Sequence, residues 1–130
     1  MPPEPSANPH AESIVPGRTV AMQIAGVTDV GRVRRRNEDA IDWDVQLGLV
    51  MVADGMGGSQ AGDIASKTAL RSIKEDLRRA MLDSARHGAR AYSPEVRGAL
   101  AVELVRRANQ GVRRSASRDD RLQGMGTTLV

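Results

Sequence analysis

Hydrophobic residues follow a strand-like alternation in the first half of this chain and a helical period in the second half. From residue 19 to residue 28, apolar residues alternate with smaller or polar neighbours, which predicts a strand. Two further strands are expected over 40–45 and 49–53, and the short connection between them predicts an antiparallel hairpin. The run Leu49–Ala53 is apolar throughout, which is typical of a strand buried on both faces.

A helical period replaces the alternation after these strands. Apolar residues recur mostly four positions apart, which predicts a helix that ends near His87-Gly88. Ser93-Pro94-Glu95 then predicts a second helix start, with Ser as N-cap, Pro at the first position and an acid in the first turn. This helix is expected to give way to a charged loop over 113–120, and 124–130 predicts a last strand. The predicted buried positions are Ile64, Ala65, Ala69, Ile73, Leu77 and Met81 in the first helix and Val96, Leu100, Leu104, Ala108 and Val112 in the second.

The order of these elements predicts an α+β fold, in which an antiparallel helix pair covers one face of an antiparallel sheet. Residues 1–18 contain five of the six prolines and few large apolar residues, so we expect a flexible leader there. The folded part is then 19–130. Because the last predicted strand stops after two apolar residues, we interpret 19–130 as the first part of a longer, truncated domain.

Composition narrows the function classes. The chain has no cysteine, which excludes disulfides and thiolate metal sites. No apolar stretch is long enough to cross a membrane and no secretory signal opens the chain, so we expect a cytoplasmic protein without a membrane partner. The net charge of +3 is compatible with nucleic-acid binding, but the arginines are scattered and aromatic residues make up only 2%. We therefore predict no nucleic-acid partner.

The residues that can carry chemistry lie at the ends of the two hairpin strands. Glu38 and Asp39 open the first strand, while Asp54 and Gly55 close the second, so the hairpin would bring three carboxylates together. Converging carboxylates repel one another unless they are neutralised, and a hard divalent cation is a common solution. Gly55 would leave its carbonyl free to turn towards such a cation. The alternative is a set of strand-end acids capped by turn amides, and the residues alone leave both open.

Three segments in this order resemble motifs of the PPM-type (type 2C) Ser/Thr protein phosphatases of bacteria. They are 28–40, which contains Arg34-x-x-Asn37-Glu38-Asp39; 52–66, which contains Asp54-Gly55-Met56-Gly57-Gly58; and Met125-Gly126-Thr127-Thr128-Leu129. The resemblance runs from about Met22 to the last residue. It implies a sandwich of two antiparallel sheets flanked by helices, of which this chain supplies part.

The resemblance also implies roles for individual residues. Two Mn²⁺ or Mg²⁺ ions would share Asp54 in the complete domain, and Glu38 and the Gly55 carbonyl would complete the protein ligands of one ion. Asp39 would hold metal-bound water, and Arg34 would bind the phosphate oxygens. The implied reaction is hydrolysis of phosphoserine or phosphothreonine in proteins by a dimetal-bound water. The implied partners are phosphorylated protein substrates, with a Ser/Thr kinase as a further candidate.

The chain departs from the family pattern in two ways. Met56 and Ser59 stand where relatives carry a histidine, and the only histidines are His10 and His87, so a dedicated general acid is not identifiable. The later acids of the family would follow Val130, so we expect the 130-residue chain alone to be inactive or weakly active. The alternative function is a non-catalytic module that binds a phosphoprotein or a kinase through Arg34 and the arginine-rich helices.

Overall fold

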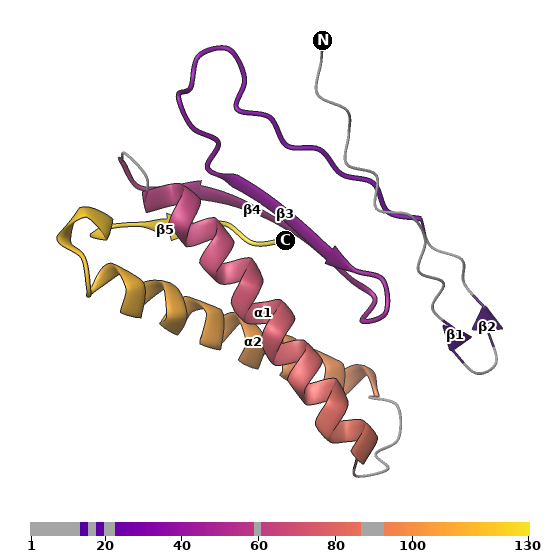
Figure 1. Cartoon of the computed structure of the whole chain (residues 1–130). Helices are drawn as coiled ribbons and strands as arrows, with labels where there is room; N and C mark the ends of the chain where they lie inside the picture. Colours follow the sequence, from indigo (N-terminus) through magenta and orange to yellow (C-terminus); the bar gives the residue numbers. More distant parts are fainter. Residues whose placement is uncertain (1–13, 16–17, 20–22, 59–60, 87–92) are drawn as a thin grey trace.

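The computed structural model describes residues 14–15, 18–19, 23–58, 61–86 and 93–130 (Figure 1). Its main body is a three-stranded antiparallel sheet with two long helices packed on one face, so the predicted α+β class is confirmed. The elements of this body are β3 (Asp39–Asp44), β4 (Leu49–Met56), α1 (Ala61–Arg86), α2 (Pro94–Ala116), the 3-10 helix η2 (Asp120–Leu122) and β5 (Gly126–Thr127). In Figure 1 the two helices run antiparallel across the sheet, as expected.

The hairpin between β3 and β4 is confirmed, and its turn fixes the register. Gly48 takes a positive φ of 61° and donates its N–H to the Val45 carbonyl at 3.1 Å. The Asp44 carboxylate accepts hydrogen bonds from the backbone N–H groups of Gln46 and Leu47. The resulting ladder pairs Asp44 with Leu49 at the turn and Asp39 with Asp54 at the far end.

The last strand predicted over 124–130 is present but covers only Gly126–Thr127. β5 lies antiparallel to β4, with Gly55 opposite Thr127. Backbone hydrogen bonds continue this pairing to the last residue, because Val52 and Val130 exchange N–H···O=C bonds of 2.9 Å in both directions. The sheet order is therefore β3-β4-β5, which leaves β3 at one edge.

The core lies between the sheet and the helices and is built largely from small residues. Ala53 of β4 and Ala65 of α1 are completely buried, and Ser66 is buried beside them with its hydroxyl donating to the Asp63 carbonyl. Small side chains let α1 approach the sheet closely. Because the chain has no Phe to fill a wider gap, this close approach is what keeps the core densely packed. The other buried apolar residues are Ala40, Met51, Ala61, Ala69, Leu70, Ile73, Leu104, Ala108, Val112 and Met125.

The second face of the sheet, here called the outer face, is covered only in part: a Cβ atom at Gly26 would lie 2.8 Å from Ile41 Cδ1 and 3.2 Å from Trp43 Cζ3, so the segment around Gly26 lies over β3. Side chains of β4 alternate between buried and exposed, and Val50 and Val52 are 52% and 48% exposed. The prediction that Leu49–Ala53 is buried on both faces is therefore wrong. Its apolar run meets a helix on one side only, because α1 packs on one face of the sheet and α2 packs against α1.

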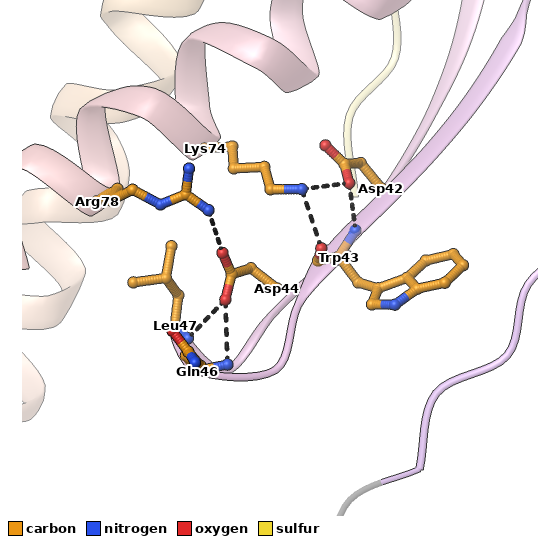
Figure 2. A network of polar contacts seen from close by, with 7 residues as sticks. All are labelled: Asp42, Trp43, Asp44, Gln46, Leu47, Lys74 and Arg78. Atoms are coloured by element: carbon orange, nitrogen blue, oxygen red, sulfur yellow. Dashed lines mark hydrogen bonds and ion pairs between the residues drawn. The ribbon is translucent and has the colours of Figure 1, made fainter. Parts of the chain in front are cut away.

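Two ion pairs bind the edge strand β3 to α1 (Figure 2). Lys74 donates to the Asp42 carboxylate at 2.7 Å and to the Trp43 carbonyl at 3.1 Å. Arg78 donates to Asp44 at 2.6 Å. Burial raises the pKa of Asp44, but the Arg78 and backbone hydrogen bonds outweigh it, so the net pKa is lowered.

The predicted end of the first helix, near His87-Gly88, agrees with the last described residue of α1, Arg86, although His87 and Gly88 lie outside the described residues. The predicted start of the second helix also agrees, whereas its predicted end does not. Ser93 caps α2 as expected, its hydroxyl accepting from the Val96 N–H at 3.4 Å. The helix continues to Ala116, so the loop predicted from residue 113 is wrong; buried Val112 keeps this turn against the core. Val96 and Met81, predicted to be buried, are 48% and 38% exposed because they lie at the helix ends away from the sheet.

The first predicted strand, 19–28, is wrong over its described residues 23–28, which form no strand. A strand needs a neighbour for its backbone groups, and in the described part of the chain none pairs with this segment. Most of the predicted leader lies outside the described residues; Ile14–Val15 (β1) and Arg18–Thr19 (β2) form a small antiparallel ladder. No helix among the described residues has both the length and the apolar character that a membrane crossing needs.

Candidate functional site

The hairpin brings the predicted site residues to one edge of the sheet, the one formed by the start of β3 and the end of β4, opposite the turn. Asp39 lies opposite Asp54 in the β3–β4 register, and the Gly55 N–H donates to the Glu38 carbonyl at 3.1 Å. The backbone convergence expected from the sequence is therefore present. It arises from the turn at the other end of the hairpin, which fixes which residues face each other.

The start of α1 closes this edge from the helix side. A Cβ atom at Gly62 would lie 2.6 Å from Glu38 Oε1 and 2.9 Å from the carbonyl carbon of Gly55. A Cβ atom at Gly55 would lie 2.0 Å from the Gly62 carbonyl oxygen. The Glu38 carboxylate, the Gly55 carbonyl group and the first turn of α1 thus meet in a space that only glycine leaves open.

Arg34 and Asn37 lie just before β3, next to these residues in the sequence. Arg34 Nη1 lies 3.6 Å from Glu38 Oε2, and the Arg34 side chain is 76% exposed. Asn37 accepts a hydrogen bond from the Asp39 N–H at 3.0 Å and donates to the Thr28 hydroxyl at 2.7 Å. Asn37 therefore fixes where β3 begins, which places the acids at this edge.

Asp54 is held by β5. Its N–H donates to the Thr128 hydroxyl at 3.0 Å, and its carbonyl accepts from the Thr128 N–H at 2.8 Å. Directly opposite residues of an antiparallel pair point to the same face, so the Asp39 and Asp54 carboxylates share the outer face of the sheet. No cation among the described residues pairs with either carboxylate, and like charges in this arrangement destabilise the sheet.

The donors fit a hard divalent cation in kind, but they do not form a complete metal site. Carboxylates and a carbonyl are the oxygen ligands that Mg²⁺ and Mn²⁺ prefer, and the opposed Asp39 and Asp54 carboxylates lack a counter-charge. Yet no group of three or more acidic or histidine side chains is arranged to hold a metal within the described ranges. Glu38 lies beside Gly55, whereas the two aspartates lie on the outer face.

Sequence reasoning missed three residues that build this edge. Gly62 makes room for the Glu38 carboxylate, Asn37 anchors the start of β3, and Thr128 anchors Asp54, although Thr127 and Thr128 suggest only strand propensity in the sequence. A glycine in the first turn of a helix was the one detectable hint for Gly62. Met56, where the family resemblance led us to expect a histidine, is 66% exposed, and Ser59, His10 and His87 lie outside the described residues.

A family model described as protein phosphatase 2C matches residues 31–130. The chain is 37% identical over 106 residues to a protein named serine/threonine phosphatase stp from Listeria welshimeri, covering 79% of this chain and 39% of that protein. It is 32% identical over 115 residues to the serine/threonine protein phosphatase PstP of Mycobacterium tuberculosis, covering 86% of this chain and 19% of that protein.

The fold agrees with a solved relative. The crystal structure of the Mycobacterium tuberculosis serine/threonine phosphatase PstP/Ppp superposes with a TM-score of 0.54 at 31% identity. That superposition covers 78% of this chain and 37% of the solved chain. The chain thus spans about two fifths of the Listeria relative and of the solved structure.

Proposed function

The chain belongs to the protein phosphatase 2C family, and on this premise we propose that it carries part of the site of a metal-dependent phosphatase acting on phosphoserine and phosphothreonine in proteins. The relatives are named as Ser/Thr phosphatases. Because the chain spans about two fifths of the Listeria relative, the activity of a whole protein is part of the proposal. A cytoplasmic location stays a prediction.

The observation that carries the proposal is the meeting of Glu38 with Gly55 and of Asp39 with Asp54 at one sheet edge. Register and the Gly55-to-Glu38 hydrogen bond place these oxygen donors together although 14 or more positions separate the two groups in the sequence. A purely structural set of strand-end acids would gain capping amides. Here the Asp39 and Asp54 carboxylates face each other without a counter-charge from the described residues, which favours an exogenous cation.

The proposed roles follow from position. Asp54 and Glu38, with the Gly55 carbonyl, would hold Mn²⁺ or Mg²⁺, and these ions would supply an activated water and neutralise charge on the phosphoryl group. Asp39 lies beside Asp54 and would hold and orient a metal-bound water through its carboxylate. Arg34 is exposed beside Glu38 and would bind two phosphate oxygens, which a guanidinium does well.

We expect the 130-residue chain by itself to bind metal weakly and to turn over slowly or not at all. The reason is that the described acids supply fewer than three converging metal-binding side chains. The alternative function is supported by the exposure of Arg34, because an exposed guanidinium can bind phosphate without a complete metal site. In that case the chain would be a non-catalytic module for a phosphoprotein or a kinase.

Mn²⁺ binding tests the proposed metal role directly. The water-proton relaxation of Mn²⁺ titrated with the chain would be compared for wild type, Asp54→Asn and Asp83→Asn. Asp83 lies near the far end of α1 and makes a loose 3.9 Å contact with Arg86, so it controls for the loss of one charge. We expect Asp54→Asn to weaken Mn²⁺ binding by about tenfold or more and Asp83→Asn to leave it unchanged.

Equal Mn²⁺ binding by wild type and Asp54→Asn would contradict the metal role. A phosphothreonine peptide titrated with and without EDTA separates the two functions. Binding that Mn²⁺ strengthens and EDTA weakens supports the phosphatase site, whereas binding that is indifferent to EDTA and lost in Arg34→Gln supports the interaction module.

A further inference from the structure

An arginine-rich loop borders the candidate site. We define the arginine loop as residues 29–36, which include Arg32, Arg35 and Arg36 in addition to Arg34. All four side chains belong to exposed residues. Arg34 contacts Glu38, whereas Arg32, Arg35 and Arg36 make no hydrogen bond or ion pair with any residue that the structure describes.

The base of the arginine loop is fixed to the site. The Asn37 side chain joins Thr28 at one end of the loop to the Asp39 N–H at the other, with bonds of 2.7 Å and 3.0 Å. Within the loop, the Gly31 N–H donates to Asp29 Oδ1 at 2.7 Å, and Gly31 takes the positive φ of 72° that the turn requires. The arginines are therefore held next to the acids and are not on a remote surface.

Six described arginines outside the loop pair with acids, namely Arg78, Arg79, Arg86, Arg106, Arg107 and Arg121, whereas Arg71, Arg113, Arg114 and Arg118 do not. Arg106 and Arg107 both bind Glu103, with N–O distances of 2.8 Å and 2.7 Å, and their hydrogen bonds lower the pKa of Glu103 to about 2. Two neighbouring guanidinium groups thus form a good receptor for one carboxylate in this molecule. In the arginine loop, the neighbours Arg35 and Arg36 lack such a carboxylate.

We infer that the arginine loop binds acidic residues that flank the phosphorylated residue of a protein substrate, an inference that rests on the proposed function. The loop carries three further exposed arginines within two positions of Arg34, the proposed phosphate-binding residue, and so matches a phosphopeptide with Asp or Glu beside the phosphate. Val33, 93% exposed between the arginines, adds an apolar contact for a peptide. The loop contains no aromatic residue on which a nucleic-acid base could stack.

The effect of each contact is limited by exposure. Exposed ion pairs contribute modestly and are screened by salt, so two arginines together change affinity by about fivefold to tenfold at low ionic strength.

The test compares three labelled peptides by fluorescence anisotropy with the full 130-residue chain. The first is a phosphothreonine peptide flanked by Glu, the second has Gln in place of each Glu, and the third is the Glu peptide without phosphate.

Variants assign the preference to the arginine loop. We expect wild type to bind the Glu-flanked phosphopeptide about fivefold to tenfold more tightly than the Gln-flanked one. Arg35→Gln/Arg36→Gln should reduce that ratio to less than about twofold. The control Arg79→Gln/Arg86→Gln removes the same charge from α1 about 25–35 Å along the helix from Gly62 and should keep the ratio.

Four other outcomes would overturn the inference or its premise separately. A ratio near one in wild type, or an equal ratio in the Arg35→Gln/Arg36→Gln variant, overturns the role of the arginine loop and leaves the proposed function intact. Equal binding of the Glu peptide with and without phosphate contradicts the phosphate site at Arg34 instead. Displacement of the peptide by a single-stranded oligonucleotide that binds more tightly, with a steeper salt dependence, assigns the loop to nucleic acid and overturns the inference.

Discussion

The close contact of Gly62 with Glu38 and Gly55 predicts that the substitution Gly62→Ala destabilises the fold. Alanine normally stabilises a helix relative to glycine, and Gly62 lies in the first turn of α1. Its new methyl group would nevertheless lie 2.6 Å from Glu38 Oε1 and 2.9 Å from the Gly55 carbonyl carbon. Real Cβ contacts are not this short, so α1, the end of β4 or the Glu38 side chain must move.

The expected change in the free energy of unfolding is the sum of two opposed contributions. Overpacking a tight site costs about 1–3 kcal/mol, while the gain in helix propensity is at most about 1 kcal/mol and smaller in a first turn. We therefore expect Gly62→Ala to lower the free energy of unfolding by about 1–2 kcal/mol. Gly98→Ala in α2 is the matched control, since its Cβ would have no neighbour within 4 Å. It should raise the free energy of unfolding by about 0.5–1 kcal/mol.

Urea unfolding followed by the helical circular dichroism of the chain measures both variants. The two substitutions are chemically identical, so opposite signs can come only from their surroundings. The close approach of α1 to Glu38 would be refuted if Gly62→Ala were as stable as wild type while Gly98→Ala gained stability. A change in the m-value rather than in the midpoint would indicate an altered unfolded or native compactness instead.

Two further predictions concern the edges of the sheet. Because the folded-state pKa of Asp44 lies below its ordinary 3.8, its contribution is full above that value and is lost as pH falls through the folded-state pKa. Asp44→Asn breaks the pair with Arg78 and should therefore lower the free energy of unfolding by about 1 kcal/mol at pH 7 and by less at pH 3. Thermal unfolding of wild type and variant at both pH values measures this difference, and an equal loss at the two pH values would contradict the prediction. Thr128→Val removes the acceptor of the Asp54 N–H and should cost about 1 kcal/mol in urea unfolding. Thr127→Val, whose hydroxyl bonds only the adjacent carbonyl, should cost less than half of that, and equal costs would show that the Thr128 bond is unimportant.

The sequence allowed the convergence of the acids to be predicted because it depends on local information. The four-residue connection 45–48, which includes Gly48, fixes an antiparallel register, and the register alone decides that Asp39 faces Asp54. The start of α2 was predictable for the same reason, since Ser93 and Pro94 act within one turn. Such features need no knowledge of distant segments.

Features that depend on distant segments were not predictable. The periodicity of 19–28 suggests a strand, but a strand forms only with a partner, and none pairs with 23–28 among the described residues. The apolar run in β4 suggests burial on both faces, but burial depends on what covers each face. The role of Gly62 depends on Glu38, which lies 24 positions earlier and on another element.

The outer face of the sheet carries both the candidate metal donors and an exposed apolar surface. Val50 and Val52 expose apolar surface in the middle of this face, while Asp39 and Asp54 place two opposed carboxylates at its end. Exposing the valines forgoes hydrophobic stabilisation, and the facing carboxylates repel each other. The family resemblance predicts a second sheet over this face. A covering layer of that kind would have to be apolar over the valines and bring cations, or the ligands that hold them, to the acidic end. Core packing and metal binding would then depend on the same added surface, which is why the donors at this edge fit a metal in kind but do not complete its site.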